Sequence, residues 1–149
     1  MKERFELFTV LIAKISRSIR KIKTEEMEEF DLKSPHVSCL YYLFKSNNLT
    51  ATELCEICQE DKSAISRSLD YLESKGYISC DSNLKKRYKC HLTLTEKGQK
   101  IGKIIADKID EILEIASDGL TEEKRIILYE SLTLISDNLE KYTKNIKHD

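Results

Sequence analysis

The feature that most constrains the fold is a pair of short helical patterns joined by a tight turn. "TATE" at residues 50–53 fits a capping box, in which the Thr50 side chain accepts from a backbone N–H and Glu53 reaches back to the N–H of Thr50. "CQED" at residues 58–61 predicts the turn, and Asp61 can cap a second helix. This second helix has an apolar ridge on one face, formed by Ile65, Leu69 and Leu72.

The second helix of the pair is polar over its first half. On or near the side away from the ridge lie Lys62, Ser63, Ser66 and Arg67. Two short helices joined by a tight turn, the second with an arginine-bearing polar half, form the helix-turn-helix arrangement, whose second helix is thin enough to enter the DNA major groove. Arg67 has an alternative, since it can bind a phosphate or pair with Asp70 or Asp61 without reading a base.

The apolar period changes after Gly76, a natural end for the second helix. Alternating residues then flank a polar loop at residues 81–89, which predicts a β-hairpin. The loop has a local cationic excess that the net charge of −1 hides, formed by Lys85, Lys86, Arg87 and Lys89. A charge run alone is usually a solvated face, but directly after a helix-turn-helix it predicts a wing, whose arginine suits the narrow minor groove.

Apolar residues near both ends of the chain recur at alternating spacings of three and four, which is typical of one narrow helical stripe. The first stripe is Phe5, Phe8, Ile12, Ile15, Ile19 and Ile22, and the last is Leu128, Leu132, Ile135, Leu139, Tyr142 and Ile146. The two stripes can bury each other in a monomeric bundle. However, another module separates them, and we therefore expect them to pair with a second copy of the chain.

Few residues in this chain break helices, since it has four glycines and one proline in 149 residues. The expected fold class is mostly α (α+β), a winged helix-turn-helix with a two-stranded β wing. Thr95 and Thr121 are placed to cap the last two helices. The predicted parts are an N-terminal dimerisation helix, a DNA-binding domain and C-terminal dimerisation helices, at residues 1–30, 34–94 and 95–149.

Other classes of function find little support in the sequence. It has no phosphate-cradling glycine loop, nucleophile elbow or paired carboxylate site, so we expect neither an enzyme nor a cofactor. A protein-docking module would more often expose an apolar anchor than uncompensated cations. No apolar run approaches the roughly 20 residues of a membrane span, and "LFTVLIA" near the N-terminus is a poor signal peptide. We expect a cytoplasmic protein with reduced cysteines and no membrane partner.

"SAISRSLDYLESKGYI" at residues 63–78, the cationic loop, and "LTLTEKG" at residues 92–98 closely resemble the MarR family of bacterial transcriptional regulators. The order of elements agrees, with one long helix before the winged module and two after it. The resemblance implies a homodimer with interleaved terminal helices, most often a repressor. Its two winged modules would bind double-stranded DNA at a pseudo-palindromic operator, with half-sites about 10 base pairs apart.

The resemblance also assigns DNA contacts to individual residues. The family's recognition-helix contact positions are matched here by Ser63, Ser66 and Arg67. Lys62 would lie near a phosphate, and Arg87 matches the arginine of the wing tip. In the family an acidic residue usually stands directly before that arginine. In this chain that position is Lys86, and Lys85 precedes it. We therefore expect the wing to contribute affinity more than sequence preference.

Members of this family are similar in binding small, often phenolic or anionic effectors between the dimer helices and the winged module. The candidate ligand-binding residues here are His36, Cys39 and Tyr42. Basic residues of the first helix can hold an anion as well, or merely solvate their face: Arg17, Arg20, Lys21 and Lys23. The sequence does not separate these alternatives.

Two cysteine pairs have spacings that suggest chemistry. Cys55 and Cys58 share a helical face, but no histidine has a matching spacing, so we interpret them as small core residues and expect no metal site. Cys80 and Cys90 are the candidate redox pair, because they flank the predicted loop and Cys90 follows a cation.

The predicted hairpin gives the second pair its geometry. If the hairpin is symmetric about Lys85, Cys80 and Cys90 are cross-strand neighbours and Ile78 faces Leu92. Oxidation would then lock or twist the wing. The oxidant-sensing branch of the resembled family has its reactive cysteine in the N-terminal helix, where this sequence has none.

Overall fold

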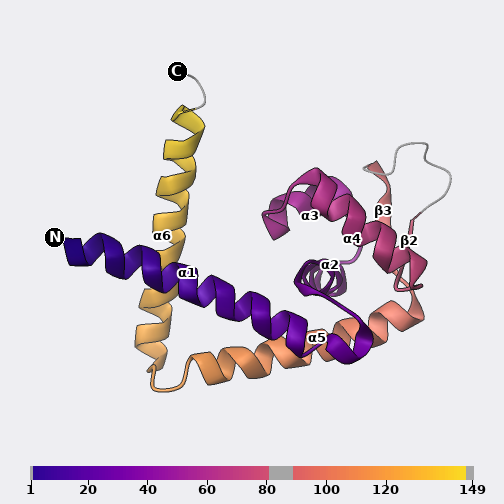
Figure 1. The fold of residues 1–149 in the computed structure, drawn as a ribbon, viewed down its shortest axis with the longest axis horizontal. Coiled ribbons are helices and arrows are strands. Elements are labelled where there is room, and N and C mark those ends of the chain that lie inside the picture. Colours follow the sequence, from indigo (N-terminus) through magenta and orange to yellow (C-terminus); the bar gives the residue numbers. More distant parts are fainter. Residues whose placement is uncertain (1, 81–88, 147–149) are drawn as a thin grey trace. The chain divides into compact units, whose positions relative to one another are not determined.

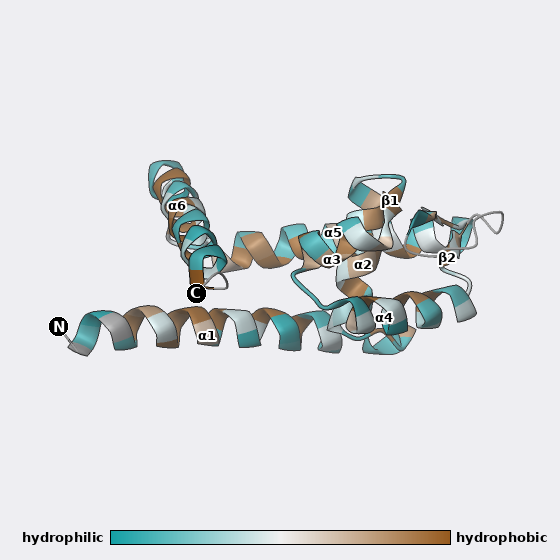
Figure 2. Ribbon diagram, turned by 90° about the horizontal axis from the view of Figure 1, so that it is seen from above, coloured by the Kyte–Doolittle hydropathy of each residue, from teal (hydrophilic) through white to brown (hydrophobic). Residues whose placement is uncertain are grey.

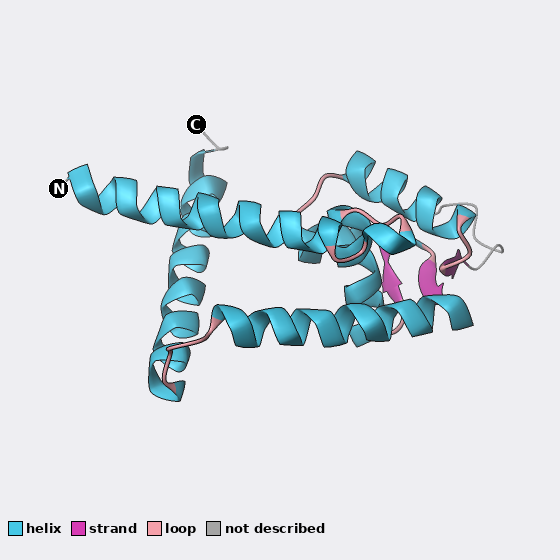
Figure 3. Cartoon of the chain, turned by 60° about the horizontal axis from the view of Figure 1, so that its bottom comes forward, coloured by secondary structure: helices cyan, strands magenta, loops and turns pink. Residues whose placement is uncertain are grey.

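The structure is a computed structural model in which residues 2–80 and 89–146 are described (Figure 1). In that part of the chain the helices are α1 (Lys2–Glu25), α2 (Ser34–Lys45), α3 (Ala51–Cys58), α4 (Lys62–Ser74), α5 (Glu96–Ala116) and α6 (Glu122–Ile146). A 3₁₀ helix, η1 (Glu28–Phe30), precedes α2, and the strands are β1 (Leu49–Thr50), β2 (Ile78–Cys80) and β3 (His91–Leu94). The mostly helical fold expected from the sequence is confirmed, and Figure 3 shows how short the strands are.

The chain divides into two compact units, at residues 1–108 and 109–149. The first unit contains α1 to β3 and most of α5, and the second contains the end of α5 and all of α6. None of the helices described is both long enough and apolar enough to cross a membrane. The three-part division expected from the sequence, with boundaries near residues 30 and 95, stays a prediction.

The apolar ridge of α4 is the centre of the first unit. Ile65, Leu69 and Leu72 are at most 1 % exposed. Helix α4 packs against α2 and α3, whose buried side chains include Leu40, Leu43 and Leu54. Burying one side chain of this size stabilises the fold by about 1.5–3 kcal/mol. The ridge therefore determines which face of α4 is left for solvent.

The predicted helix caps are confirmed. Thr50 Oγ1 accepts from the Glu53 N–H at 3.2 Å, and the Thr50 N–H donates to Glu53 Oε2 at 2.7 Å, which completes the capping box of α3. Asp61 Oδ1 accepts from the Ala64 N–H at 2.7 Å and caps α4. The Thr95 hydroxyl accepts from the Gly98 N–H in the first turn of α5, and the Thr121 hydroxyl accepts from the Lys124 N–H in the first turn of α6.

Within the described residues, the strands form one antiparallel sheet in the order β1-β3-β2. The wing strands β2 and β3 therefore belong to a sheet of three strands rather than two. Strand β1 escapes prediction because two residues are too short to show an alternating pattern. Ile78 pairs with Leu94, and Cys80 pairs with Leu92. The hairpin symmetric about Lys85, with Ile78 facing Leu92, is wrong by two residues, a shift that keeps the same side chains on the buried face.

The apolar stripes of the two terminal helices are exposed in the single chain, and Figure 2 shows their hydrophobic bands. On α1 the exposed fraction is 40–55 % for Phe8, Ile12, Ile15 and Ile19. On α6 it is 38–65 % for Leu128, Leu132, Leu139, Tyr142 and Ile146. Apolar surface that continues over whole helices marks an interaction site rather than scattered exposure.

Gly98, in the first turn of α5, lies against the chain that follows α4. A Cβ atom on Gly98 would lie 2.0 Å from the carbonyl oxygen of Tyr77. The Gly98 N–H donates to Thr95 Oγ1 at 3.0 Å, and the Thr95 hydroxyl donates to the Gly76 carbonyl at 2.6 Å. The glycine of "LTLTEKG" thus allows the start of α5 to pack closely against the segment between α4 and β2.

The substitution Gly98→Ala should destabilise the fold by about 1–3 kcal/mol, because the added methyl group forces the backbones apart. The sign is informative, since alanine is otherwise the better residue in a helix by about 1 kcal/mol. Urea unfolding of the variant and of the exposed neighbour Gln99→Ala measures the effect. A stabilised Gly98→Ala variant would contradict the close approach.

Candidate nucleic-acid interface

The first half of α4 presents a polar face to solvent. The structure brings together four of the seven predicted DNA-binding residues on it, and all four are exposed: Lys62, Ser63, Ser66 and Arg67. The buried ridge on the other side holds this face outward. The other three predicted DNA-binding residues lie outside the described residues: Lys85, Lys86 and Arg87.

A chain of hydrogen bonds organises the start of α4. The Ser63 hydroxyl donates to Asp61 Oδ1 at 2.7 Å, and Arg67 Nη1 donates to Ser63 Oγ at 3.5 Å. The Ala64 N–H, followed by the Ser63 hydroxyl and the nearby Arg67 charge, holds the pKa of Asp61 below its usual value. Asp61 therefore caps the helix and keeps the Ser63 and Arg67 side chains near the helix N-terminus, where a phosphate is favoured.

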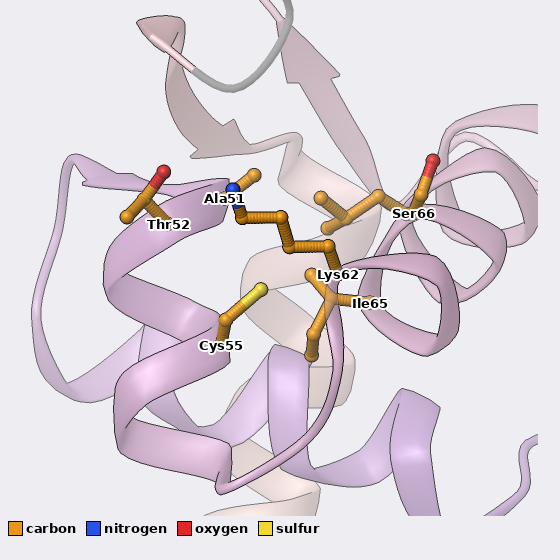
Figure 4. Close-up of a pocket in the computed structure, with 7 residues that line it drawn as sticks. Ala51, Thr52, Cys55, Lys62, Ile65 and Ser66 are labelled. Carbon is orange, nitrogen blue, oxygen red and sulfur yellow. The ribbon is translucent and has the colours of Figure 1, made fainter. Parts of the chain in front are cut away.

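A cavity of about 310 Å³ lies between α3 and α4, beside this polar face. Figure 4 shows Lys62 extending across it from α4 toward Ala51, while Thr52 and Cys55 line it from α3. Thr52 is exposed and was not among the residues expected to contact DNA. The sequence places Thr52 in the first turn of a capped helix. It does not show that this turn lies beside the polar face of α4, because the packing of α3 on α4 is a tertiary property.

The cysteines at the ends of β2 and β3 lie together. The structure joins Cys80 and Cys90 by a disulfide bond, with a Cα–Cα distance of 6.2 Å. Cys80 is the last residue of β2, and Cys90 immediately precedes β3, whose Leu92 is the direct partner of Cys80. Lys89, the one wing cation among the described residues, is exposed beside this pair.

The three candidate ligand-binding residues on α2 have different surroundings. His36 stacks on Tyr71 of α4, with ring centroids 4.3 Å apart, and its Nδ1 accepts from the Lys33 N–H at 3.0 Å. Desolvation, then the Lys33 charge, lowers the pKa of His36. Cys39 is fully buried. Tyr42 packs edge-on against Tyr41, and burial raises its pKa. A ligand-binding role for these residues stays a prediction.

Tyr71 makes contacts to which no pattern in the sequence points. Its hydroxyl donates to the Asp31 carbonyl at 2.5 Å and lies 2.9 Å from Asp31 Oδ2. These contacts tie the second half of α4 to the segment before α2, and the His36 stack ties it to the first turn of α2. Nothing in the local pattern distinguishes Tyr71 from a residue flanking the ridge. Among the described residues, no cluster of three or more His, Cys, Asp or Glu could hold a metal ion.

Residues 36–113 match the family of winged helix DNA-binding domains. An HTH-type transcriptional regulator of Bacillus cereus is 26 % identical over 136 residues, which cover 91 % of this chain and 90 % of the relative. The HTH-type transcriptional regulator YfiV of Bacillus subtilis is 25 % identical over 135 residues, which cover 91 % of this chain and 84 % of the relative.

Solved structures with the same fold include two that contain DNA. A MarR family regulator from Listeria monocytogenes, complexed with a 26mer DNA, has a TM-score of 0.82 at 24 % identity and covers 93 % of this chain and 92 % of its own. The S. aureus MepR–DNA complex has a TM-score of 0.79 at 22 % identity, with coverage of 89 % and 97 %. The likeness of these structures to this chain establishes the fold.

Replacing Asp61 with Asn should flatten the loss of stability in acid. Because the folded-state pKa of Asp61 is depressed, its contribution is complete above the unfolded pKa of about 3.9 and is lost as the pH falls through the folded pKa. Asn still caps the helix but does not titrate. Urea unfolding at a series of acidic pH values should show a smaller loss for Asp61→Asn than for the parent. The exposed control Glu60→Gln should lose as much stability in acid as the parent does. A loss in Asp61→Asn equal to that of the parent, or an equal reduction of the loss in Glu60→Gln, would contradict this role.

Proposed function

The chain belongs to the winged helix DNA-binding domain family, has the fold of MarR-type regulators and is a DNA-binding transcriptional regulator. From this premise we propose that it acts as a homodimeric repressor. The observation that carries the proposal is the exposed polar face of α4, held outward by a buried ridge. This is the geometry that a helix needs to enter a major groove.

In this proposal the residues of α4 divide into two kinds of contact. Ser63, Ser66 and Arg67 contact base edges, and Lys62 neutralises a phosphate. The hydrogen bonds from Arg67 to Ser63 and from Ser63 to Asp61 support the assignment, because they orient the guanidinium before DNA arrives. Lys85, Lys86 and Arg87 add a cationic wing for the minor groove.

A second copy of the chain is the proposed partner of the exposed stripes on α1 and α6. Their chemistry supports this occupant, since each is a narrow apolar seam with the spacing of paired helices. A two-fold dimer would also place two recognition helices on one DNA site. Together they would read two half-sites of a pseudo-palindrome and so raise the sequence specificity above that of one short helix.

We further propose that the dimer works in the cytoplasm as a regulator rather than as an enzyme, and that a small anionic or phenolic effector releases it from DNA. His36, Cys39 and Tyr42 are the proposed effector residues. A second signal is oxidation of Cys80 and Cys90, because a bond between the strands that flank the cationic loop constrains that loop. A winged module turned to protein binding is the competing function.

Selection from a random DNA library, under reducing conditions and at low salt, tests the proposed function. A pseudo-palindrome with half-sites about one helical turn apart and a steep salt dependence is the expected result. Enrichment of no sequence would instead favour the protein-binding module.

On the selected duplex, Arg67→Ala should cost about 1–3 kcal/mol of binding free energy and relax specificity at the base pair it contacts. Arg87→Ala should weaken all sequences similarly and lower the salt slope by about one. Fluorescence anisotropy at several salt concentrations measures both effects, with the exposed α5 cation in Lys100→Ala as the control. Parental binding by both variants would show that the site assignment is wrong.

The change Ile15→Glu should convert the dimer to a monomer, because it places a charge in the proposed seam of α1. Arg17→Glu is the matched control, since a spacing of two residues puts it on the opposite side of the same helix. Sedimentation velocity over a range of protein concentrations separates the two species. A dimer that persists in Ile15→Glu at low concentration would exclude α1 from the interface.

A further inference from the structure

Directional contacts join the second half of α4 to the residues around the start of α2. The Tyr71 ring stacks on the His36 ring, with centroids 4.3 Å apart and an angle of 9° between the two planes. The Tyr71 hydroxyl donates to the Asp31 carbonyl at 2.5 Å. Lys75, the C-cap residue of α4, has its Nζ 5.5 Å from the centroid of the Tyr71 ring and 3.9 Å from Asp31 Oδ2. These contacts are separate from the apolar ridge of α4.

The segment that receives Tyr71 is itself anchored in the first unit. Met27 and Leu32 are at most 2 % exposed, and the Leu32 N–H donates to the Met27 carbonyl at 3.2 Å. Between them, Asp31 ends η1 in a left-handed conformation with φ of 56°. The Ser34 N–H donates to Thr24 Oγ1 at 3.3 Å, which ties the start of α2 to the end of α1. Tyr71 therefore binds to a support that is fixed independently of α4.

Such contacts can fix the position of α4 more closely than its ridge does. Burial of the ridge decides which face of α4 points outward, but apolar burial is non-directional and tolerates small shifts of a helix. A hydrogen bond and a stacked ring pair have preferred distances and angles. Tyr71 lies one turn after Arg67 on the same helix, so a contact that fixes Tyr71 also limits how Arg67 and Ser63 can move.

The geometry at His36 depends on its protonation state. His36 Nδ1 accepts from the Lys33 N–H at 3.0 Å. A neutral imidazole has one nitrogen that can accept, and an imidazolium has none, so a proton on Nδ1 removes this bond. The titratable groups around His36 are Lys33 and Asp31 before α2, and Tyr71 and Lys75 of α4. Desolvation, then the Lys33 charge, lowers the pKa of His36, and Asp31 opposes them.

We propose that Tyr71, Asp31 and His36 form a clamp that positions α4 for DNA, and that the clamp loosens when His36 gains a proton. The proposal rests on the proposed function, because it takes α4 as the helix that reads DNA. The clamp residues are positioning residues that act through Ser63 and Arg67.

The clamp gives DNA binding a pH dependence of defined sign. Because the clamped form holds the His36 proton less tightly, acid favours the loose form as the pH falls below about 6.5, the ordinary pKa of histidine. Affinity for DNA should therefore fall in mild acid. A positive charge gained by His36 with no clamp would have the opposite effect, since added cations strengthen binding to a polyanion.

The variant Tyr71→Phe tests the hydrogen bond on the full-length protein, with the selected duplex and no effector. It keeps the stacked ring and loses the hydroxyl. Its affinity for DNA should fall several-fold at neutral pH while the salt slope stays that of the parent, because no phosphate contact is removed. Tyr41→Phe makes the same change on α2 and should bind as the parent does. Fluorescence anisotropy measures binding, and far-ultraviolet circular dichroism checks that each variant is folded.

The variant His36→Gln tests the proton. Glutamine at this position can still accept from the Lys33 N–H, as in a capping box, but it does not titrate. When the pH is lowered from about 7.5 to about 5.5, the parent should lose several-fold more affinity than His36→Gln loses. His148→Gln is the control histidine near the end of the sequence and should follow the parent.

A measurement without DNA separates this proposal from the proposed function. Histidine ring resonances followed by NMR should show His36 titrating below about 6.5 in the parent, with its midpoint moved upward in Tyr71→Phe. This readout decides whether the clamp exists even if no DNA sequence is selected. The clamp is overturned if Tyr71→Phe leaves the His36 midpoint or DNA affinity unchanged, or if His36→Gln keeps the acid loss of the parent.

Discussion

The burial of one apolar ridge determines most of what this protein can do. The side chains of Ile65, Leu69 and Leu72 are at most 1 % exposed, because α4 packs them against α2 and α3. Because a helix has a fixed period, burying that ridge turns the polar residues of α4 outward. The same packing makes α3 a support for α4. Without it, the polar stretch that begins at Asp61 would be only a solvated peptide.

Charge in this chain is organised locally rather than globally. The net charge is −1, yet the start of α4 carries Lys62 and Arg67 at a helix N-terminus, where the backbone itself favours an anion. Asp61 lies in the middle of this field, but its charge is used to cap the helix and to hold Ser63. Acidic residues elsewhere cancel these cations in a sum but not at the surface of α4.

Local patterns predicted the parts of the fold that depend on neighbouring residues. Both the capping box at Thr50 and the cap at Asp61 are confirmed. They could be predicted because a cap depends on residues two or three positions apart. Strand β1 was not predicted, and the predicted register of the hairpin was wrong, because strand pairing is decided by contacts across the sheet. The contacts of Tyr71 with Asp31 were missed for the same reason, since forty positions separate the two residues.

The sequence by itself determined the type of module, the order of its helices and the polar face of α4, since all three follow from spacing along the chain. Only the tertiary structure decided which distant side chains meet. Lys23 of α1, for example, donates to Ser38 Oγ of α2 at 3.0 Å, although the spacing within neither helix brings these two side chains together. The physical reason is that periodicity specifies which way a side chain faces, while its chemical surroundings depend on the elements packed against that face.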